Sequence, residues 1–221
     1  MAGEKFEVNM SALLFLRAVK SHPQFQIASN MDAAGGFDDI VLNLGSHTTF
    51  LQLKHRENKQ CKIYKSQLIQ LKGDFSLLKY CKSYQEIKQK WDKDKDLKLL
   101  GKFEDSLFII FTNAVLAEGM GSEVESSEIQ DIVNSGGKCV HFTQERDGDI
   151  YKIFENFSHY KKLLSDAVKS AEPSNTPELL EVIQKLHNNS AKTVPGKTDL
   201  NKLLKEMDSL GDLSDYCEFL S

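Results

Sequence analysis

Three polar side chains interrupt two segments with the composition of β-strands, and their types suit phosphodiester chemistry. Asp39 lies in FDDIVLNL (37–44), while Gln52 and Lys54 lie in TTFLQLKH (48–55). An acid, an amide oxygen and an amine on one face could hold a hard divalent cation and offset phosphate charge. Taken singly, Asp39 could end a bend and Lys54 could protect a sheet edge. Two breaks of the apolar pattern at facing positions point instead to a functional site.

The two segments predict a β-hairpin whose register brings these side chains together. Glycine at the first turn position is what a type II′ turn requires, so Gly45 and Ser46 are the expected turn residues. Counting outward from that turn places Asp39 opposite Gln52. A three-residue loop would put Asp38 on that face instead, because a slip of one residue inverts every side chain. The turn glycine favours Asp39.

The expected chemistry is that of a metal-dependent phosphodiesterase. The Asp39 carboxylate, the Gln52 amide oxygen and the Leu53 carbonyl are candidate ligands for Mg²⁺ or Mn²⁺, since such ions prefer oxygen. A bound metal lowers the pKa of a water ligand and stabilises charge on the phosphate. Glu7 is the candidate acid from the first helix, with Glu4 as the second choice.

Lys54 is the candidate catalytic lysine, placed to position the attacking water and to offset phosphate charge. It also begins a basic region. Between Lys54 and Lys102 the chain has 14 Lys and Arg against six acids, within a chain of net charge −4. Such a stretch could attract a polyanion, although on charge alone a solvated lysine-rich helix is the more frequent explanation. The candidate nucleic-acid contacts are His55, Arg56, Lys59, Lys62 and Lys65.

The surrounding elements must position this hairpin. Apolar spacing predicts a helix over Phe6 to Lys20, and a short strand over Phe25 to Ser29. Helical periodicity from Tyr64 to Trp91, interrupted near Gly73, is the right size for a right-handed crossover. The apolar run Ser106 to Thr112 predicts a strand buried on both faces at the centre of the sheet, parallel to the second hairpin strand.

The C-terminal part reads as helical. We expect a short helix over Ser126 to Asn134, a strand over Lys138 to Phe142 and only helices from Ile150 onward. Thr176 and Pro177 have the pattern of a helix start. The predicted linkers are 171–175 and 188–197. The apolar stripe of the helix at 200–207 favours packing on its own domain over binding a partner. The expected domains are 1–157 and a helical extension, 158–221.

The order of these elements and motifs resembles the PD-(D/E)XK, or restriction-endonuclease-like, nuclease superfamily over roughly Glu4 to Phe142. The FDDIVL and FLQLKH segments are most similar to Q-x-K variants, such as nuclease domains of bacterial anti-phage effectors and related uncharacterised animal proteins. The resemblance implies an α/β fold, a mixed central sheet flanked by helices, and an Mg²⁺-dependent endonuclease acting on DNA rather than RNA. The usual Glu is Gln52 here, which keeps an oxygen ligand and removes a charge.

Composition sets the remaining expectations. Four dispersed cysteines without a C-x-x-C motif, and an N-terminal segment without a signal-peptide pattern, predict a reduced, intracellular protein of the cytoplasm or nucleus, without a membrane partner. The alternative functions are a nuclease fold that binds nucleic acid without cutting it, and an adaptor that recruits a protein partner through its C-terminal helices. Many nucleases of this kind act as dimers so as to cut both strands, so the resemblance is also compatible with a homodimer.

Overall fold

The computed structural model describes residues 2–58, 60–124, 139–171 and 175–220. The chain divides into two compact units. Unit 1 comprises residues 1–62, 83–116 and 121–141, and unit 2 comprises residues 63–82, 117–120 and 142–221. The predicted domain boundary at 157/158 lies inside a helix, α6 (Gln144–Lys169). The units are therefore built from interleaved segments.

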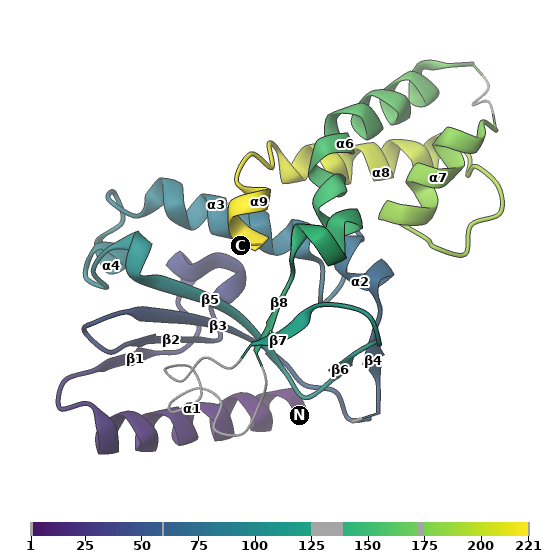
Figure 1. Ribbon diagram of the computed structural model, residues 1–221. Coiled ribbons are helices and arrows are strands. Elements are labelled where there is room, and N and C mark those ends of the chain that lie inside the picture. Colours follow the sequence, from purple (N-terminus) through teal and green to yellow (C-terminus); the bar gives the residue numbers. More distant parts are fainter. Residues whose placement is uncertain (1, 59, 125–138, 172–174, 221) are drawn as a thin grey trace. The chain divides into compact units, whose positions relative to one another are not determined.

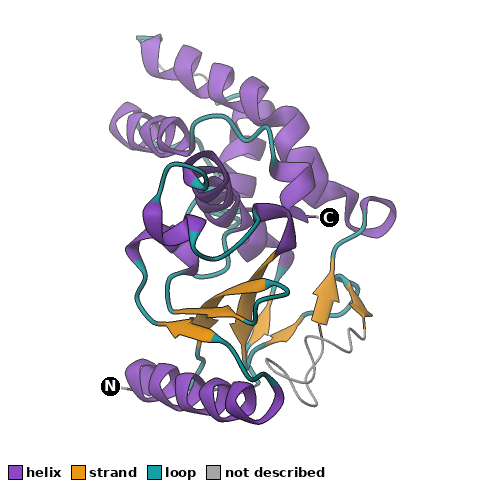
Figure 2. Cartoon of the chain, turned by 90° about the vertical axis from the view of Figure 1, so that its left-hand side faces the viewer, coloured by secondary structure: helices purple, strands orange, loops and turns teal. Residues whose placement is uncertain are grey.

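A four-stranded mixed sheet forms the centre of unit 1 (Figures 1 and 2). Its strands lie in the order β1 (Gln26–Ala28), β2 (Ile40–Asn43), β3 (Thr48–Lys54) and β5 (Ser106–Thr112). Strand β2 is antiparallel to β1 and β3, and β3 is parallel to β5. The predicted α/β class, the mixed sheet, the hairpin and the parallel pairing are confirmed.

The predicted place of Ser106–Thr112 is wrong. Among the described residues, β5 pairs only with β3 and ends the strand order. All seven of its residues are half-buried, whereas six of the seven residues of β3 are buried. The strand at the centre is therefore β3, the one that carries Gln52 and Lys54.

The two faces of the sheet are covered by different parts of unit 1. Helix α1 (Ala2–Ser21) lies along one face (Figure 2). Its residues Met10, Leu14 and Ala18 form a buried cluster with every second residue of the neighbouring strands, because successive side chains of a strand point to opposite faces. Those sheet residues are Ile40, Leu42, Leu44, Leu51 and Leu53.

The opposite face has an aromatic core. The rings of Phe50 and Phe108 stack with centroids 4.9 Å apart, and Tyr84 meets Phe108 edge-on at 5.1 Å. Trp91 packs against Phe50 at 5.9 Å. From sequence, Tyr80, Tyr84 and Trp91 are candidates for stacking on nucleic-acid bases or, as is more frequent, core residues of an amphipathic helix. All three are buried, which confirms the core alternative.

The remaining elements of unit 1 are short. They are the 3₁₀ helices η1 (Asp32–Phe37) and η2 (Phe103–Asp105), helix α4 (Lys95–Lys98), and strands β6 (Val115–Leu116), β7 (Ser122–Val124) and β8 (Cys139–His141). Strand β4 (Lys62–Ile63) starts in this unit. The predicted strand at 138–142 corresponds to β8, which pairs with β7. The helix predicted at 126–134 lies outside the described residues.

Unit 2 is helical, as predicted from Ile150 onward. It contains α2 (Lys65–Ile69), α6, α7 (Pro177–Leu186), α8 (Lys197–Leu210) and α9 (Tyr216–Leu220). The predicted break near Gly73 separates α2 from α3 (Leu77–Lys90), which runs from unit 2 into unit 1. The apolar stripe of α8, Leu200, Leu203, Met207 and Leu210, is buried, so this helix packs within its own unit.

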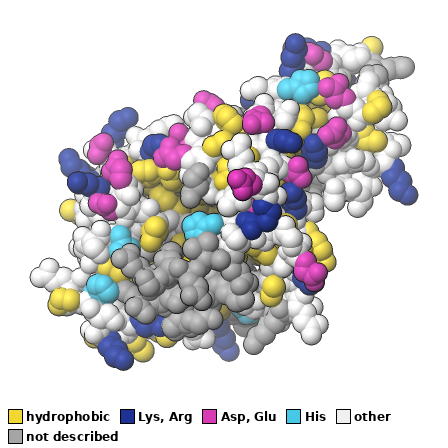
Figure 3. All heavy atoms as spheres, viewed as in Figure 1, with side chains coloured by type: hydrophobic (Ala, Val, Ile, Leu, Met, Phe, Trp, Pro, Cys, Tyr) yellow, Lys and Arg dark blue, Asp and Glu magenta, His cyan; other side chains and the backbone are white. Residues whose placement is uncertain are grey.

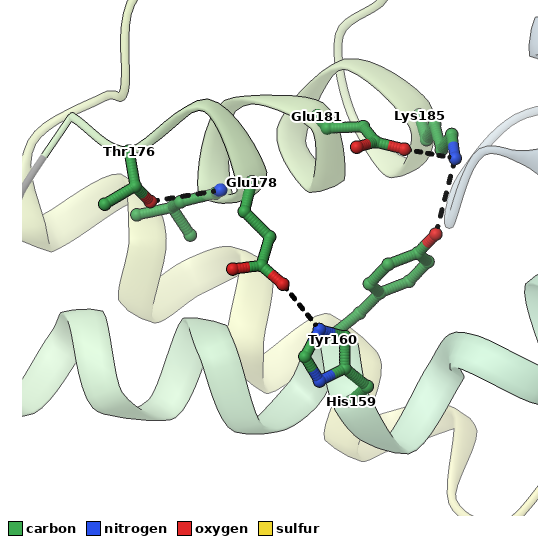
Figure 4. Close-up of polar contacts among 7 residues, drawn as sticks. His159, Tyr160, Thr176, Glu178, Glu181 and Lys185 are labelled. Atoms are coloured by element: carbon green, nitrogen blue, oxygen red, sulfur yellow. Dashed lines mark hydrogen bonds and ion pairs between the residues drawn. The ribbon is translucent and has the colours of Figure 1, made fainter.

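The start of α7 is held by polar contacts (Figure 4). The Thr176 hydroxyl accepts a hydrogen bond from the Leu179 N–H at 3.3 Å, which confirms the predicted cap. His159 of α6 contacts Glu178 of α7 at 2.9 Å. Lys185 of α7 donates to the Tyr160 hydroxyl of α6 and to Glu181 of its own helix. These ties are partly exposed and contribute little stability individually.

Charged side chains of both signs are interspersed over the helical unit on the face drawn in Figure 3. None of the helices in the described ranges has the length and apolar character needed to cross a membrane.

Candidate metal and phosphodiester site

The hairpin has the predicted register. Ile40 pairs with Leu51, so the next position outward sets Asp39 opposite Gln52. The Leu44 N–H donates to the His47 carbonyl at 3.0 Å across a two-residue turn. Gly45 has a φ of 83° there, a conformation that L side chains rarely adopt. A local turn thus determines which acid faces β3.

Asp39 lies just before β2 and fastens that end to β3. Its Oδ2 accepts hydrogen bonds from the Leu53 backbone N–H at 2.6 Å and from the Gln52 side-chain amide. Asp38 takes another role, with its carbonyl accepting from the Met31 N–H at 3.2 Å. Between the two acids, Asp39 is the one that meets the motif.

The other two motif groups follow from strand geometry. The N–H and C=O of one strand residue point to the same neighbouring strand, so the Leu53 carbonyl lies on the Asp39 side of β3. Gln52 and Lys54 share the opposite face from Leu53 because side chains alternate. Gln52 is 5% exposed, whereas Lys54 is half-buried.

Helix α1 brings Glu7 to the same end of β3. The Phe6 ring contacts the His55 ring, with centroids 4.9 Å apart, which fixes the start of the helix beside the end of the strand. Desolvation raises the pKa of the Glu7 carboxyl, the negative charge of Asp39 raises it further, and the charge of Lys54 lowers it. The Glu7 carboxyl therefore interacts electrostatically with both Asp39 and Lys54.

The donor set is oxygen-rich and low in charge. In the part of the chain that the structure describes, no three His, Cys, Asp or Glu side chains gather as a metal site. The predicted set does not need such a group, because it combines two acids with an amide and a backbone carbonyl. Oδ1 of Asp39 accepts no hydrogen bond from described residues, which leaves it for a cation. These donors suit Mg²⁺ or Mn²⁺, which also retain water ligands.

The predicted nucleic-acid contacts belong to both units. His55 and Arg56 continue β3 past the site, and Lys62 is exposed in the same unit. Lys65 belongs to unit 2, where it forms an ion pair with Asp149 at 2.8 Å. That hydrogen bond from Lys65 lowers the pKa of Asp149. Lys59 lies outside the described residues.

Two further polar residues hold the segments that flank the site. The Asn113 amide accepts from the Arg56 N–H and donates to the Arg56 carbonyl, both at 2.7 Å, and so joins the chain after β5 to the chain after β3. The Ser83 hydroxyl accepts from the Gly36 N–H at 2.5 Å and holds η1, the segment before Asp39. From sequence, Asn113 directly after the apolar strand is either a site neighbour or a strand cap, whereas Ser83 carries no such signal.

Comparisons with known proteins add no relative: no protein family, curated protein or solved structure matches the chain.

Proposed function

We propose that unit 1 is a divalent-metal-dependent nuclease of the PD-(D/E)XK type that hydrolyses phosphodiester bonds in DNA. The observation that carries this proposal is the meeting of Asp39 with Gln52 and Leu53 at one end of β3, with Lys54 next in the same strand. A carboxylate, an amide, a carbonyl and an amine from two adjacent strands form a compact set for a cation and a phosphate.

Asp39, Gln52, Leu53 and Glu7 would hold Mg²⁺ or Mn²⁺ through oxygen atoms. When bound, the ion would supply Lewis acidity for the phosphate and a water of lowered pKa. Oδ1 of Asp39 is the atom available for this role, since Oδ2 is already used by two donors. Burial raises the pKa of Glu7 and the charge of Asp39 raises it further, and a bound cation would offset the repulsion between the two carboxylates.

Lys54 acts on the phosphate side of the site. Its position two residues after Gln52 puts the ammonium group on the same strand face, where it can hydrogen-bond a phosphate oxygen or the attacking water. Gln52 is buried and tied to Asp39, so it orients the carboxylate as well as offering an oxygen. His55 and Arg56 extend from the same strand end toward the nucleic-acid backbone.

Cleavage of a supercoiled plasmid by the full chain with Mg²⁺ or Mn²⁺ tests the proposal. Lys54→Ala should lower the rate by roughly a hundredfold or more, as removal of one transition-state charge contact does. Lys93→Ala, which alters an exposed lysine of the turn after α3, should cleave like the wild type. Circular dichroism should show both variants folded. Undiminished cleavage by Lys54→Ala, or no cleavage by the wild type with either ion, would contradict the proposal.

One feature favours a second candidate, a module of the same fold that binds nucleic acid without cutting it. Gln52 stands where an acid would add ligand charge, and its amide N–H, rather than its oxygen, meets Asp39. Calorimetric titration with Mn²⁺ distinguishes the two functions. A nuclease binds the ion in the absence of DNA and loses binding in Asp39→Asn, whereas the binding module retains DNA affinity without measurable ion binding.

A further inference from the structure

Helix α1 is apolar on two opposite sides. Met10, Leu14 and Ala18 are buried against the sheet. A second stripe, defined here as Val8, Ala12, Phe15, Leu16 and Val19, recurs at helical spacing on the other side. Its large members are 68% (Val8), 47% (Phe15), 65% (Leu16) and 55% (Val19) exposed. A surface helix usually places polar residues there, and a helix that is apolar all round is usually covered.

The stripe is large for a free surface. Its four large side chains are about half exposed or more and adjoin one another, and the largest contiguous apolar patch on a monomer is often functional. Beside it, α1 and β1 line a groove of about 430 Å³ through Phe15, Leu16 and Ile27.

The ends of the stripe carry opposite charges. Residues Glu4, Val8, Ala12, Leu16 and Lys20 follow one another at four-residue intervals and form a ridge of the kind that packs between helices. Ala12, the smallest, is at the middle. In a two-fold symmetric dimer both subunits use the same surface. With the two-fold axis at Ala12, the N-terminal end of this ridge faces the C-terminal end of the same ridge in the second copy.

We infer that the outer side of α1 is a homodimer interface, in which α1 packs antiparallel to α1 of a second copy. Val8 lies against Leu16 of the second copy, and Glu4 against Lys20 of the second copy. The apolar area, the small central residue and the complementary charges at the two ends all fit a second copy of this helix. The inference does not depend on nuclease activity.

Light scattering coupled to size-exclusion chromatography tests the interface. We expect a wild-type dimer with a Kd in the micromolar range or below. Leu16→Glu should raise that Kd more than about a hundredfold, since the symmetric contact is lost twice. Leu99→Glu is the matched control, because Leu99 is 73% exposed and lies outside α1. A wild-type monomer at all concentrations, including one that binds lipid vesicles instead, or a dimer unaffected by Leu16→Glu, would overturn the inference.

Charge reversal tests the antiparallel arrangement itself. Glu4→Lys alone and Lys20→Glu alone each replace two attractive contacts by repulsive ones, and each should weaken the dimer about three- to tenfold. The double variant restores opposite charges at both ends and should dimerise like the wild type. Single variants with unchanged affinity, or a double variant weaker than both, would reject this pairing of Glu4 with Lys20.

Discussion

The Asp39 carboxylate accepts a hydrogen bond of 2.6 Å from the backbone N–H of Leu53, so a candidate metal ligand also ties the end of β2 to β3. Leu53 is 5% exposed, and water can do little to replace this acceptor if it is removed. Loss of activity in an Asp39 variant is therefore ambiguous unless stability is measured beside it.

Two substitutions at Asp39 separate the two roles. Asp39→Asn keeps an oxygen acceptor for the Leu53 N–H and should cost less than about 1 kcal/mol of unfolding free energy, whereas Asp39→Ala should cost about 1–3 kcal/mol. Both should lose Mn²⁺ binding, because both lack the carboxylate. Urea unfolding and calorimetry measure the two effects. An Asp39→Asn variant that binds Mn²⁺ like the wild type would remove Asp39 from the ligand set.

Gln52→Glu tests whether the amide is a weakened ligand. A carboxylate there should tighten Mn²⁺ binding by roughly tenfold, an effect of about 1.4 kcal/mol. In the metal-free protein it should lower the Tm near pH 7, because two adjacent carboxylates repel and one acquires a raised pKa. That destabilisation develops as pH rises through the raised pKa and is absent below the unfolded-state value.

Gln52→Leu is the matched control for that substitution, since it retains the bulk and removes every oxygen. Calorimetry should show loss of Mn²⁺ binding, and thermal unfolding should show no dependence on the titration of a second carboxylate. If Glu, Gln and Leu at position 52 give the same ion affinity, the side chain of this residue does not contact the ion.

The hairpin was predictable from sequence because its determinants are local. Gly45 permits the positive φ that a two-residue turn needs. Once the turn is placed, the register determines which side chains of β3 point to each face of the sheet. The buried role of Tyr80, Tyr84 and Trp91 was harder to predict, because helical spacing identifies a stripe but not whether it faces the core or a ligand. Their intervals of four and seven residues are those of a core stripe.

The place of β5 and the composition of unit 2 depend on contacts between distant segments. The apolar run SLFIIFT indicates that both faces of the strand are apolar. It does not indicate whether one or two neighbouring strands pair with it. Likewise, residues 63–82 join residues 142–221 in unit 2, although the hairpin precedes them directly in the chain. Periodicity predicts elements, and long-range packing decides their neighbours.

Gly35→Ala should destabilise the segment that leads into Asp39. Gly35 has a φ of 56°, and a Cβ there would lie 2.5 Å from the Ser83 hydroxyl oxygen, which also accepts from the Gly36 N–H. The combined strain should cost about 2–3 kcal/mol in urea unfolding. Gly148→Ala is the control, since its Cβ meets open space in α6 and should be neutral or stabilising by up to about 1 kcal/mol. Equal stability of the two variants would contradict the packing described for η1.

Glu7→Gln should stabilise the metal-free protein while impairing function. Desolvation and the charge of Asp39 raise the pKa of Glu7 in the folded state, so its ionisation opposes folding. The stability associated with protonated Glu7 is complete below the unfolded-state pKa and is lost as pH rises through the folded-state pKa. Gln, which stays neutral, should therefore raise the Tm near pH 7 by a few degrees at most, and have little effect near pH 3.

The exposed Glu4 provides the comparison for that variant. Glu4→Gln removes the same charge from the same helix one turn before Glu7, and it should lower Mn²⁺ affinity less than Glu7→Gln, because Glu4 acts on the first-choice acid only through its charge. Glu7→Gln should weaken that affinity severalfold, since it takes one carboxylate from the cluster that a cation stabilises. Thermal unfolding at both pH values, with and without Mn²⁺, measures both effects. Glu7→Gln should raise the Tm of the metal-free protein and reduce the increase in Tm that Mn²⁺ causes. If Mn²⁺ raises the Tm of Glu7→Gln as much as that of Glu4→Gln, Glu7 lies outside the metal site and Asp39 is the sole acid of that site.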